Sequence, residues 1–349
     1  MSSNLKLPLF IALILFSQSG CKPLGANMSV PPPASITGVR VVAPAELPSE
    51  LITEGSVSER QSGIAGDLTI FLSGEHQGSL ETCGCPIRPR GSLPRSAAYI
   101  NQHHATHPNS KQLILNGGYW LSDAISAEST LRRDAEVQND WMIRGLESIG
   151  LHAANVTWAD LPGLNGKDIP EWAVSANITT TSTQQSPIPG STIVDLGGLR
   201  IGITGITEPT AGFIATPNFE IIDPVEPAVE ILNSLADQVD ILVLLSYRSH
   251  EAAANIAQMV PELDLIVDTG LHREYAVPFI HETAIWTQSH FQTQRLGELI
   301  VDVDGDEITL LMARMIDMDP EVGNHPGTFE LMMSARRAIE NIQMELFGP

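Results

Sequence analysis

From residue 67 onward, short apolar runs alternate with longer stretches that carry apolar residues at helical spacing. The early apolar runs have the length and the residue types of buried strands. They span residues 68–72, 113–115, 173–176, 199–203, 241–245 and 265–267. Helical stretches lie at residues 128–149, 225–239 and 250–259. Strands and helices that alternate in this way predict an α/β fold with a parallel sheet.

Two late apolar runs differ because no helical stretch separates them. They cover residues 297–301 and 308–311, and Asp304–Gly305 between them has the residue types of a hairpin turn. We therefore expect an antiparallel addition to the sheet. The final stretch, residues 328–346, is amphipathic, so we expect residues 319–349 to form a helical tail.

The first 65 residues have the pattern of an export signal followed by a tether. Lys6 precedes an apolar run at residues 7–16, which is too short to cross a bilayer as a helix and is typical of a signal peptide. Small residues then precede Cys21, as in a bacterial lipoprotein cleavage site. Gln18 stands where an aliphatic residue is usual, so cleavage without lipidation remains an alternative.

We therefore expect a signal peptide at residues 1–20 and a lipid on Cys21 that makes the membrane a partner. Residues 21–65 include three consecutive prolines and little apolar periodicity, which is typical of an extended tether. This organisation predicts a lipid-anchored protein of the bacterial cell envelope. It leaves open whether the protein resides at the outer membrane or otherwise faces the periplasm.

The composition of the chain argues against some classes of function and partner. The chain has 349 residues, of which 43% are hydrophobic, and this is enough for a sizeable core. Its 19 basic and 41 acidic residues give a net charge of -22, which argues against a nucleic-acid partner because little phosphate charge could be neutralised. A small anionic ligand would need a locally basic site. Three cysteines are too few for a scaffold stapled by disulfides.

Polar loops follow the predicted strands, where open α/β sheets place their chemistry. They lie at residues 74–78, 116–119, 155–160, 246–250 and 268–272, with Ser175–Ile178 and Gly198–Ile203 between them. Over residues 66–318 this order resembles the catalytic domain of the calcineurin-like metallophosphoesterases, in their 5′-nucleotidase branch. The resemblance implies a single α/β domain, a metallophosphoesterase-like four-layer αββα sandwich.

The same resemblance implies two divalent metals, held by Asp, His and Asn on these loops. In this chain Glu75 and Gln77 stand at the Asp and His of the first loop, and Tyr119 stands at the carboxylate of the second. Tyr247 replaces a further His, and Trp158 begins the segment that matches an Asn-His-Glu loop. Phenol and indole side chains are poor ligands for such cations.

The positions that still carry a donor are Glu75, Gln77, Asn116, Asn155 and His272. This set predicts that a two-metal centre is lost. The cofactor stays open between none and a single divalent or soft metal ion. His76 lies one residue out of register with the matched ligands, so we expect its side chain to face away from the site.

A Cys83-Gly84-Cys85 segment follows the first loop, as in a divergent set of exported 5′-nucleotidase-like domains that this chain resembles. Alternate residues of an extended chain point the same way, so both thiols could serve one site. Arg88, Arg90 and Arg95 follow and would favour the thiolate form. The pair fits a redox dithiol, a soft-metal site or a structural disulfide. The arginines fit either recognition of an anionic group or simple surface charge.

Three functions remain open at this stage. The first is an envelope protein without two-metal hydrolysis that works through Cys83 and Cys85. The second is a divergent phosphoester hydrolase with one metal, and the third is a non-catalytic binding or scaffold module whose protein partner is unknown. A histidine-rich segment, residues 102–107, is predicted to end a helix on the solvated surface.

Overall fold

The computed structural model describes residues 66–82, 87, 89–125, 130–210, 215–270, 278–289, 294–304 and 307–348. The predicted signal peptide, the tether and Cys21 lie outside the described residues. So do Cys83, Cys85, Arg88 and His272. Among the described residues, no helix is long and apolar enough to span a membrane.

The first sheet has six strands in the order β14-β13-β1-β2-β3-β4. Their bounds are Leu68–Ser73 for β1, Lys111–Asn116 for β2, Ala153–Asn155 for β3, Ala173–Val174 for β4, Arg295–Asp304 for β13 and Glu307–Asp317 for β14. Strands β1 to β4 run parallel, whereas β13 pairs antiparallel with both β1 and β14. The expected antiparallel addition is confirmed, and Asp304 pairs with Glu307 across the hairpin.

The second sheet also has six strands, in the order β11-β12-β10-β9-β7-β6. Their bounds are Ser191–Asp195 for β6, Arg200–Thr207 for β7, Ile241–Tyr247 for β9, Leu265–Thr269 for β10, Phe279–His281 for β11 and Ala284–Gln288 for β12. The four inner strands are parallel, and the two edge strands are antiparallel to their neighbours. A separate two-stranded sheet pairs β5, Ile178–Thr180, with β8, Phe219–Ile221.

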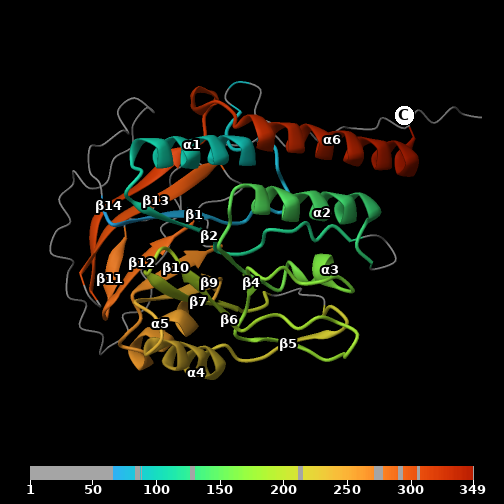
Figure 1. Cartoon of the computed structure of the whole chain (residues 1–349). Helices are drawn as coiled ribbons and strands as arrows, with labels where there is room; N and C mark the ends of the chain where they lie inside the picture. Colours follow the sequence, from blue (N-terminus) through green and yellow to red (C-terminus); the bar gives the residue numbers. More distant parts are fainter. Residues whose placement is uncertain are drawn as a thin grey trace, which may run out of the picture. The chain divides into compact units, whose positions relative to one another are not determined.

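The helices cover the outer faces of the two large sheets (Figure 1). They are α1 (Leu93–Thr106), α2 (Arg133–Ser148), α3 (Leu161–Leu164), α4 (Val225–Ala236), α5 (His250–Met259) and α6 (Pro326–Phe347), with a short 3₁₀ turn at Pro320–Val322. Helix α6 packs against α1 and α2.

Three apolar cores separate these layers. Leu93 of α1, Met142 of α2 and Met332 of α6 pack with Phe71 and Ile114 of the first sheet. A second core lies between the sheets and includes Leu68, Leu113, Ile203, Val243 and Val267. The third joins α4 and α5 to the second sheet through Leu232, Ile256, Leu244, Ile266 and Trp286. The order helix, sheet, sheet, helix confirms the predicted four-layer α/β sandwich.

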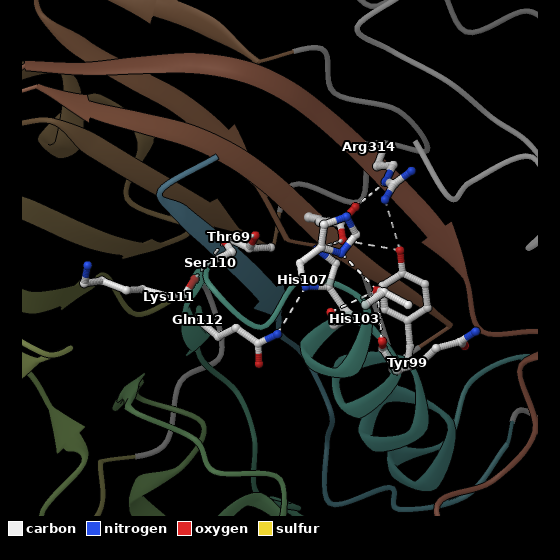
Figure 2. Close-up of polar contacts among 11 residues, drawn as sticks. Thr69, Tyr99, His103, His107, Ser110, Lys111, Gln112 and Arg314 are labelled. Carbon is white, nitrogen blue, oxygen red and sulfur yellow. Dashed lines mark hydrogen bonds and ion pairs between the residues drawn. The ribbon is translucent and has the colours of Figure 1, made fainter. Parts of the chain in front are cut away.

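A buried polar network fastens α1 to the β13–β14 hairpin (Figure 2). Glu298 is fully buried, and the Arg314 guanidinium donates to its Oε2. The Tyr99 hydroxyl donates to Glu298 Oε1 at 3.3 Å and accepts from Arg314 Nη2 at the same distance. Such a pair is tolerated in a core only because each charge meets a partner with good hydrogen bonding.

His103 belongs to this network, and the prediction of a solvated position for it is wrong. Its ring is 5% exposed, with Nε2 3.6 Å from Glu298 Oε1 and Nδ1 3.1 Å from Gln112 Nε2. His103 shares a helix face with Tyr99 and Ile100, which are also buried. Burial first, and then the charges of His107, Arg314 and His104, lower its pKa to about 4. His104 is exposed, as expected.

Removing one charge of the Glu298–Arg314 pair should destabilise the fold strongly. We expect Arg314→Met to lower the free energy of unfolding by about 3–5 kcal/mol, because the Glu298 carboxylate would stay buried without its partner. The double variant Glu298→Gln, Arg314→Met should lose clearly less than the sum of the two single changes. Urea denaturation measures both, and simple additivity would contradict a coupled pair.

Candidate functional site

Loops from both sheets converge at the carboxyl ends of the parallel strands. In the first sheet, the backbone N–H groups of Glu75 and Gln77 donate to the carbonyls of Gly118 and Tyr119 at 2.8 and 3.0 Å. Asn155, at the end of β3, reaches across the two sheets. Its Nδ2 donates to Ile206 O of β7 at 2.9 Å and to Gly117 O at 3.4 Å. The structure therefore brings together the loops that the sequence marked as the site.

Three aromatic rings meet at this edge. The ring centroids of Tyr119 and Tyr247 are 6.1 Å apart, and Trp158 lies 6.4 Å from each of them. Tyr247 is fully buried, whereas Tyr119 and Trp158 are half-buried. Burial and the neighbouring carboxylates raise the pKa of both phenols above the ordinary value, so both stay protonated. The Tyr119 hydroxyl donates to Asp123 Oδ1 at 2.9 Å.

Glu75 lies beside these rings and is only 3% exposed. The Tyr247 hydroxyl is 3.5 Å from its Oε1, and Arg248 Nη2 is 3.8 Å from the same oxygen. The guanidinium carbon of Arg248 also lies 5.5 Å from the centroid of the Tyr247 ring, within the range of a cation–π contact. A carboxylate, a phenol and a guanidinium thus form one charge-balanced group.

Backbone strain is concentrated in the same loops. Glu75, Gln77, Tyr119 and Arg248 have φ values of 46°, 52°, 55° and 55°, in the left-handed region that side-chain-bearing residues rarely adopt. Each such residue costs about 1–3 kcal/mol and persists only where its surroundings enforce it. Of the seven non-glycine residues with positive φ in the described segments, these four belong to the site. This concentration is typical of a functional site.

Other polar side chains of the site are occupied by local hydrogen bonds. Asn116 Oδ1 accepts from Gly118 N at 2.9 Å. The buried Asp160 carboxylate accepts from Leu121 N at 2.8 Å, from Thr157 N at 2.9 Å and from Thr157 Oγ1 at 2.6 Å. Burial raises the pKa of Asp160 to about 7, although these hydrogen bonds act in the opposite direction. Asp160 therefore organises its loop and has little capacity left for a ligand.

Comparisons with known proteins bear on the fold. No family model and no curated protein matches the chain. Solved structures do match it. Over 80% of this chain the sulfate thiohydrolase SoxB of Thermus thermophilus has a TM-score of 0.63 at 15% identity, and a 5′-nucleotidase precursor of the same organism has 0.61 over 78% at 19% identity. The chain therefore shares its fold with these two proteins, and also with a calcineurin-like phosphoesterase of Bacillus subtilis, which has a TM-score of 0.55 over 79% of this chain at 15% identity.

An NAD nucleotidase from Haemophilus influenzae has the same fold, with a TM-score of 0.62 over 78% of this chain at 14% identity. These matches confirm the predicted resemblance and the fold. The chain spans only 62%, 59% and 60% of the length of SoxB, the 5′-nucleotidase precursor and the NAD nucleotidase. The activities in their names therefore remain those of the three proteins themselves.

The described side chains do not fit the two-metal centre that the 5′-nucleotidase fold implies. Within the described ranges, no three His, Cys, Asp or Glu side chains lie close enough to hold one metal ion. Asn116 already accepts a hydrogen bond, and the two tyrosines are protonated. Asn155 Oδ1 is an exception, because it is buried and has no hydrogen-bond partner.

Described residues on either side of the cysteine pair make several contacts. Thr82 and Gly91 form an antiparallel bridge, and Gly91 N donates to Met318 O at 2.9 Å. Arg95 is 8% exposed and donates to Pro89 O at 2.5 Å and to Met318 O at 2.8 Å. Arg90 forms ion pairs with Asp317 at 3.1 Å and Asp319 at 3.4 Å. Recognition of an anion by these arginines remains a prediction.

Arg248 is the site residue that the sequence reasoning missed. The aromatic residues were considered only as replacements for lost ligands. A usable signal was that Tyr119 and Tyr247 both follow predicted strands and should therefore lie at the same edge, with Arg248 directly after Tyr247. His76 is buried in this loop, and neither ring nitrogen has a partner.

Burial lowers the pKa of His76 from 6.5 to about 4, and this should make stability depend on pH. The unfolded chain binds the proton below pH 6.5, whereas the folded protein binds it only near pH 4, so His76 destabilises the fold as the pH falls through this window. We expect wild type to lose about 2 kcal/mol relative to His76→Leu between pH 7.5 and 5.

Chemical denaturation at the two pH values measures this difference. The His104→Leu variant, which changes an exposed histidine, is the matched control. Its free energy of unfolding should change with pH as that of wild type does. If the difference in free energy of unfolding between wild type and His76→Leu is the same at both pH values, His76 is not held neutral by burial.

Proposed function

We propose that the protein is an exported, lipid-anchored component of the bacterial cell envelope with a 5′-nucleotidase-like domain that does not perform two-metal phosphoester hydrolysis. The observation that carries this proposal is the side-chain set at the strand ends. There, the rings of Tyr119, Trp158 and Tyr247 meet, and Tyr247 contacts both members of the Glu75–Arg248 ion pair. Two-metal catalysis needs clustered anionic and imidazole donors that polarise a phosphoryl group and activate water.

The site is instead suited to recognition. Its charges are balanced internally, and the half-buried rings of Tyr119 and Trp158 provide apolar area with polar edges. Preformed sites of this kind bind ligands through shape and a few placed polar groups.

We propose that Cys83 and Cys85 are the residues that carry the chemistry of the protein. Their spacing and the arginines that follow support this proposal, because guanidinium groups favour thiolate. The segment begins and ends at residues held by the Thr82–Gly91 bridge and by the Arg90 and Arg95 contacts. A redox dithiol, a soft-metal site and a disulfide remain the three forms to distinguish.

A divergent one-metal hydrolase is the second candidate. It is favoured by Asn155, whose buried Oδ1 has no hydrogen-bond partner although such a group normally finds one. Glu75, Asn116 and His272 would complete the donor set. In that case Asn155→Ala should abolish both the bound metal and the activity.

Metal content and phosphoesterase activity test the main proposal. We expect the purified Cys21→Ser variant, saturated with Mn²⁺ or Zn²⁺ and then desalted, to retain fewer than two ions per chain. It should also fail to hydrolyse nucleotides and generic phosphoesters. Two tightly bound ions together with hydrolysis would contradict the proposal, whereas one ion with activity that Asn155→Ala removes would support the second candidate.

Thiol titration of the same Cys21→Ser variant tests the cysteine pair, because Cys83 and Cys85 are then the only cysteines. We expect two reactive thiols after reduction and reversible loss of both on oxidation. Rapid titration of metal-free protein as isolated would exclude a structural disulfide.

The Cys21→Ser variant also tests the lipid anchor, since the protein should move from the membrane fraction to the soluble fraction.

A further inference from the structure

The Arg248 guanidinium lies where a buried negative charge requires compensation. Glu75 is 3% exposed, and an ionised carboxylate at such a position is costly unless it is paired. Arg248 Nη2 is 3.8 Å from Glu75 Oε1, and the guanidinium carbon is 5.5 Å from the Tyr247 ring. A carboxylate and an aromatic face are the two groups that bind organic cations in proteins.

The backbone around Arg248 is built to admit this side chain. Gly270, at the end of β10, has φ +88°, and a Cβ there would lie 2.6 Å from Arg248 Cγ and 3.0 Å from Tyr247 Cε2. Any larger residue at this position would therefore collide with the arginine side chain. Arg248 itself has a φ of 55°, which costs energy that the surrounding contacts must offset. Both features place backbone of unusual conformation directly beside this side chain.

We propose that this is a cation site filled from within, in which Arg248 is the resident cation and Glu75, Tyr247 and the gap over Gly270 form its binding cage. Once Arg248 is truncated, the cage takes a small external guanidinium ion. The inference rests on the proposed function, because it explains how a buried carboxylate at the strand ends is neutralised without a metal.

Rescue of Arg248→Ala by ethylguanidinium chloride tests the proposal. We expect this variant to melt several degrees below wild type. Millimolar ethylguanidinium should then raise its Tm in a saturable way, beyond the effect of NaCl at equal ionic strength, because a ligand that binds only the folded state stabilises it. N-ethylurea, which has a similar shape and no charge, should give no such rise.

Three controls isolate the cage. Wild type should not respond, since Arg248 occupies its own site. The double variant Glu75→Gln, Arg248→Ala should not respond either, because the anionic partner is gone. Arg337→Ala, which removes an exposed guanidinium on α6, should leave both the Tm and the ethylguanidinium response as in wild type. An Arg248→Ala protein that behaves like its NaCl control overturns the inference.

If Arg248→Ala does not fold, Arg248→Lys and Arg248→Met decide the question. The lysine variant keeps the charge and should stay close to wild type in Tm, whereas the methionine variant should fall well below it. If Arg248→Lys and Arg248→Met lose equal amounts of Tm, the inference is overturned. The metal content of wild type is measured separately. Two bound ions per chain would refute the proposed function. A metal-free wild type together with an Arg248→Ala variant that ethylguanidinium does not rescue would refute only the proposal that Arg248 is a resident cation.

Discussion

The structure depends on the apolar contact between its two sheets. Leu68, Leu113, Ile203, Val243 and Val267 are buried hydrophobic residues of the core between the sheets. Because this core joins parallel strands from both sheets, the loops at their carboxyl ends meet at one edge. Asn155 marks the meeting point, since its amide donates to a carbonyl of each sheet. A Cβ on Gly205 would lie 2.2 Å from Asn155 Oδ1, so a glycine is needed for this crossing.

At that edge the polar groups mostly satisfy one another. Asp160 accepts from Thr157 in its own loop and from Leu121 N in the loop after β2. Asn116 accepts from Gly118 N, and Tyr247 and Arg248 approach Glu75. In a low-dielectric environment such internal pairing is worth more than it would be in water, and an unpaired group is correspondingly costly. The site therefore keeps the strained backbone expected of a working pocket, while its charges are balanced by side chains of the chain itself.

A second buried ionic group lies on the outer face of the first sheet, and sequence patterns alone did not reveal it. Glu298 and Arg314 lie on neighbouring strands, and no sequence pattern indicated that either is paired. His103 was expected at the solvated end of a helix, but it is buried. Periodicity predicted parts of both strands, but the predicted second strand ended at residue 311, before Arg314, and of the helix only its end near residues 102–107 was expected. It could not show that one polar residue from each would meet under α1, because that depends on how the helix crosses the sheet.

The sequence by itself predicted helices α2, α4 and α5, the antiparallel hairpin, the loops that form the site and the strands β1, β2, β4, β7, β9 and β10, because hydrophobic periodicity and turn residues act locally. It did not predict the short strands β3, β5, β6, β8, β11 and β12. It also determined that aromatic side chains stand at positions where a resemblance leads one to expect metal ligands. Only the tertiary structure decided that Tyr119, Trp158 and Tyr247 meet and that Arg248 reaches Glu75 over Gly270. Those contacts join residues far apart in the chain, and packing of the two sheets is what brings them within reach.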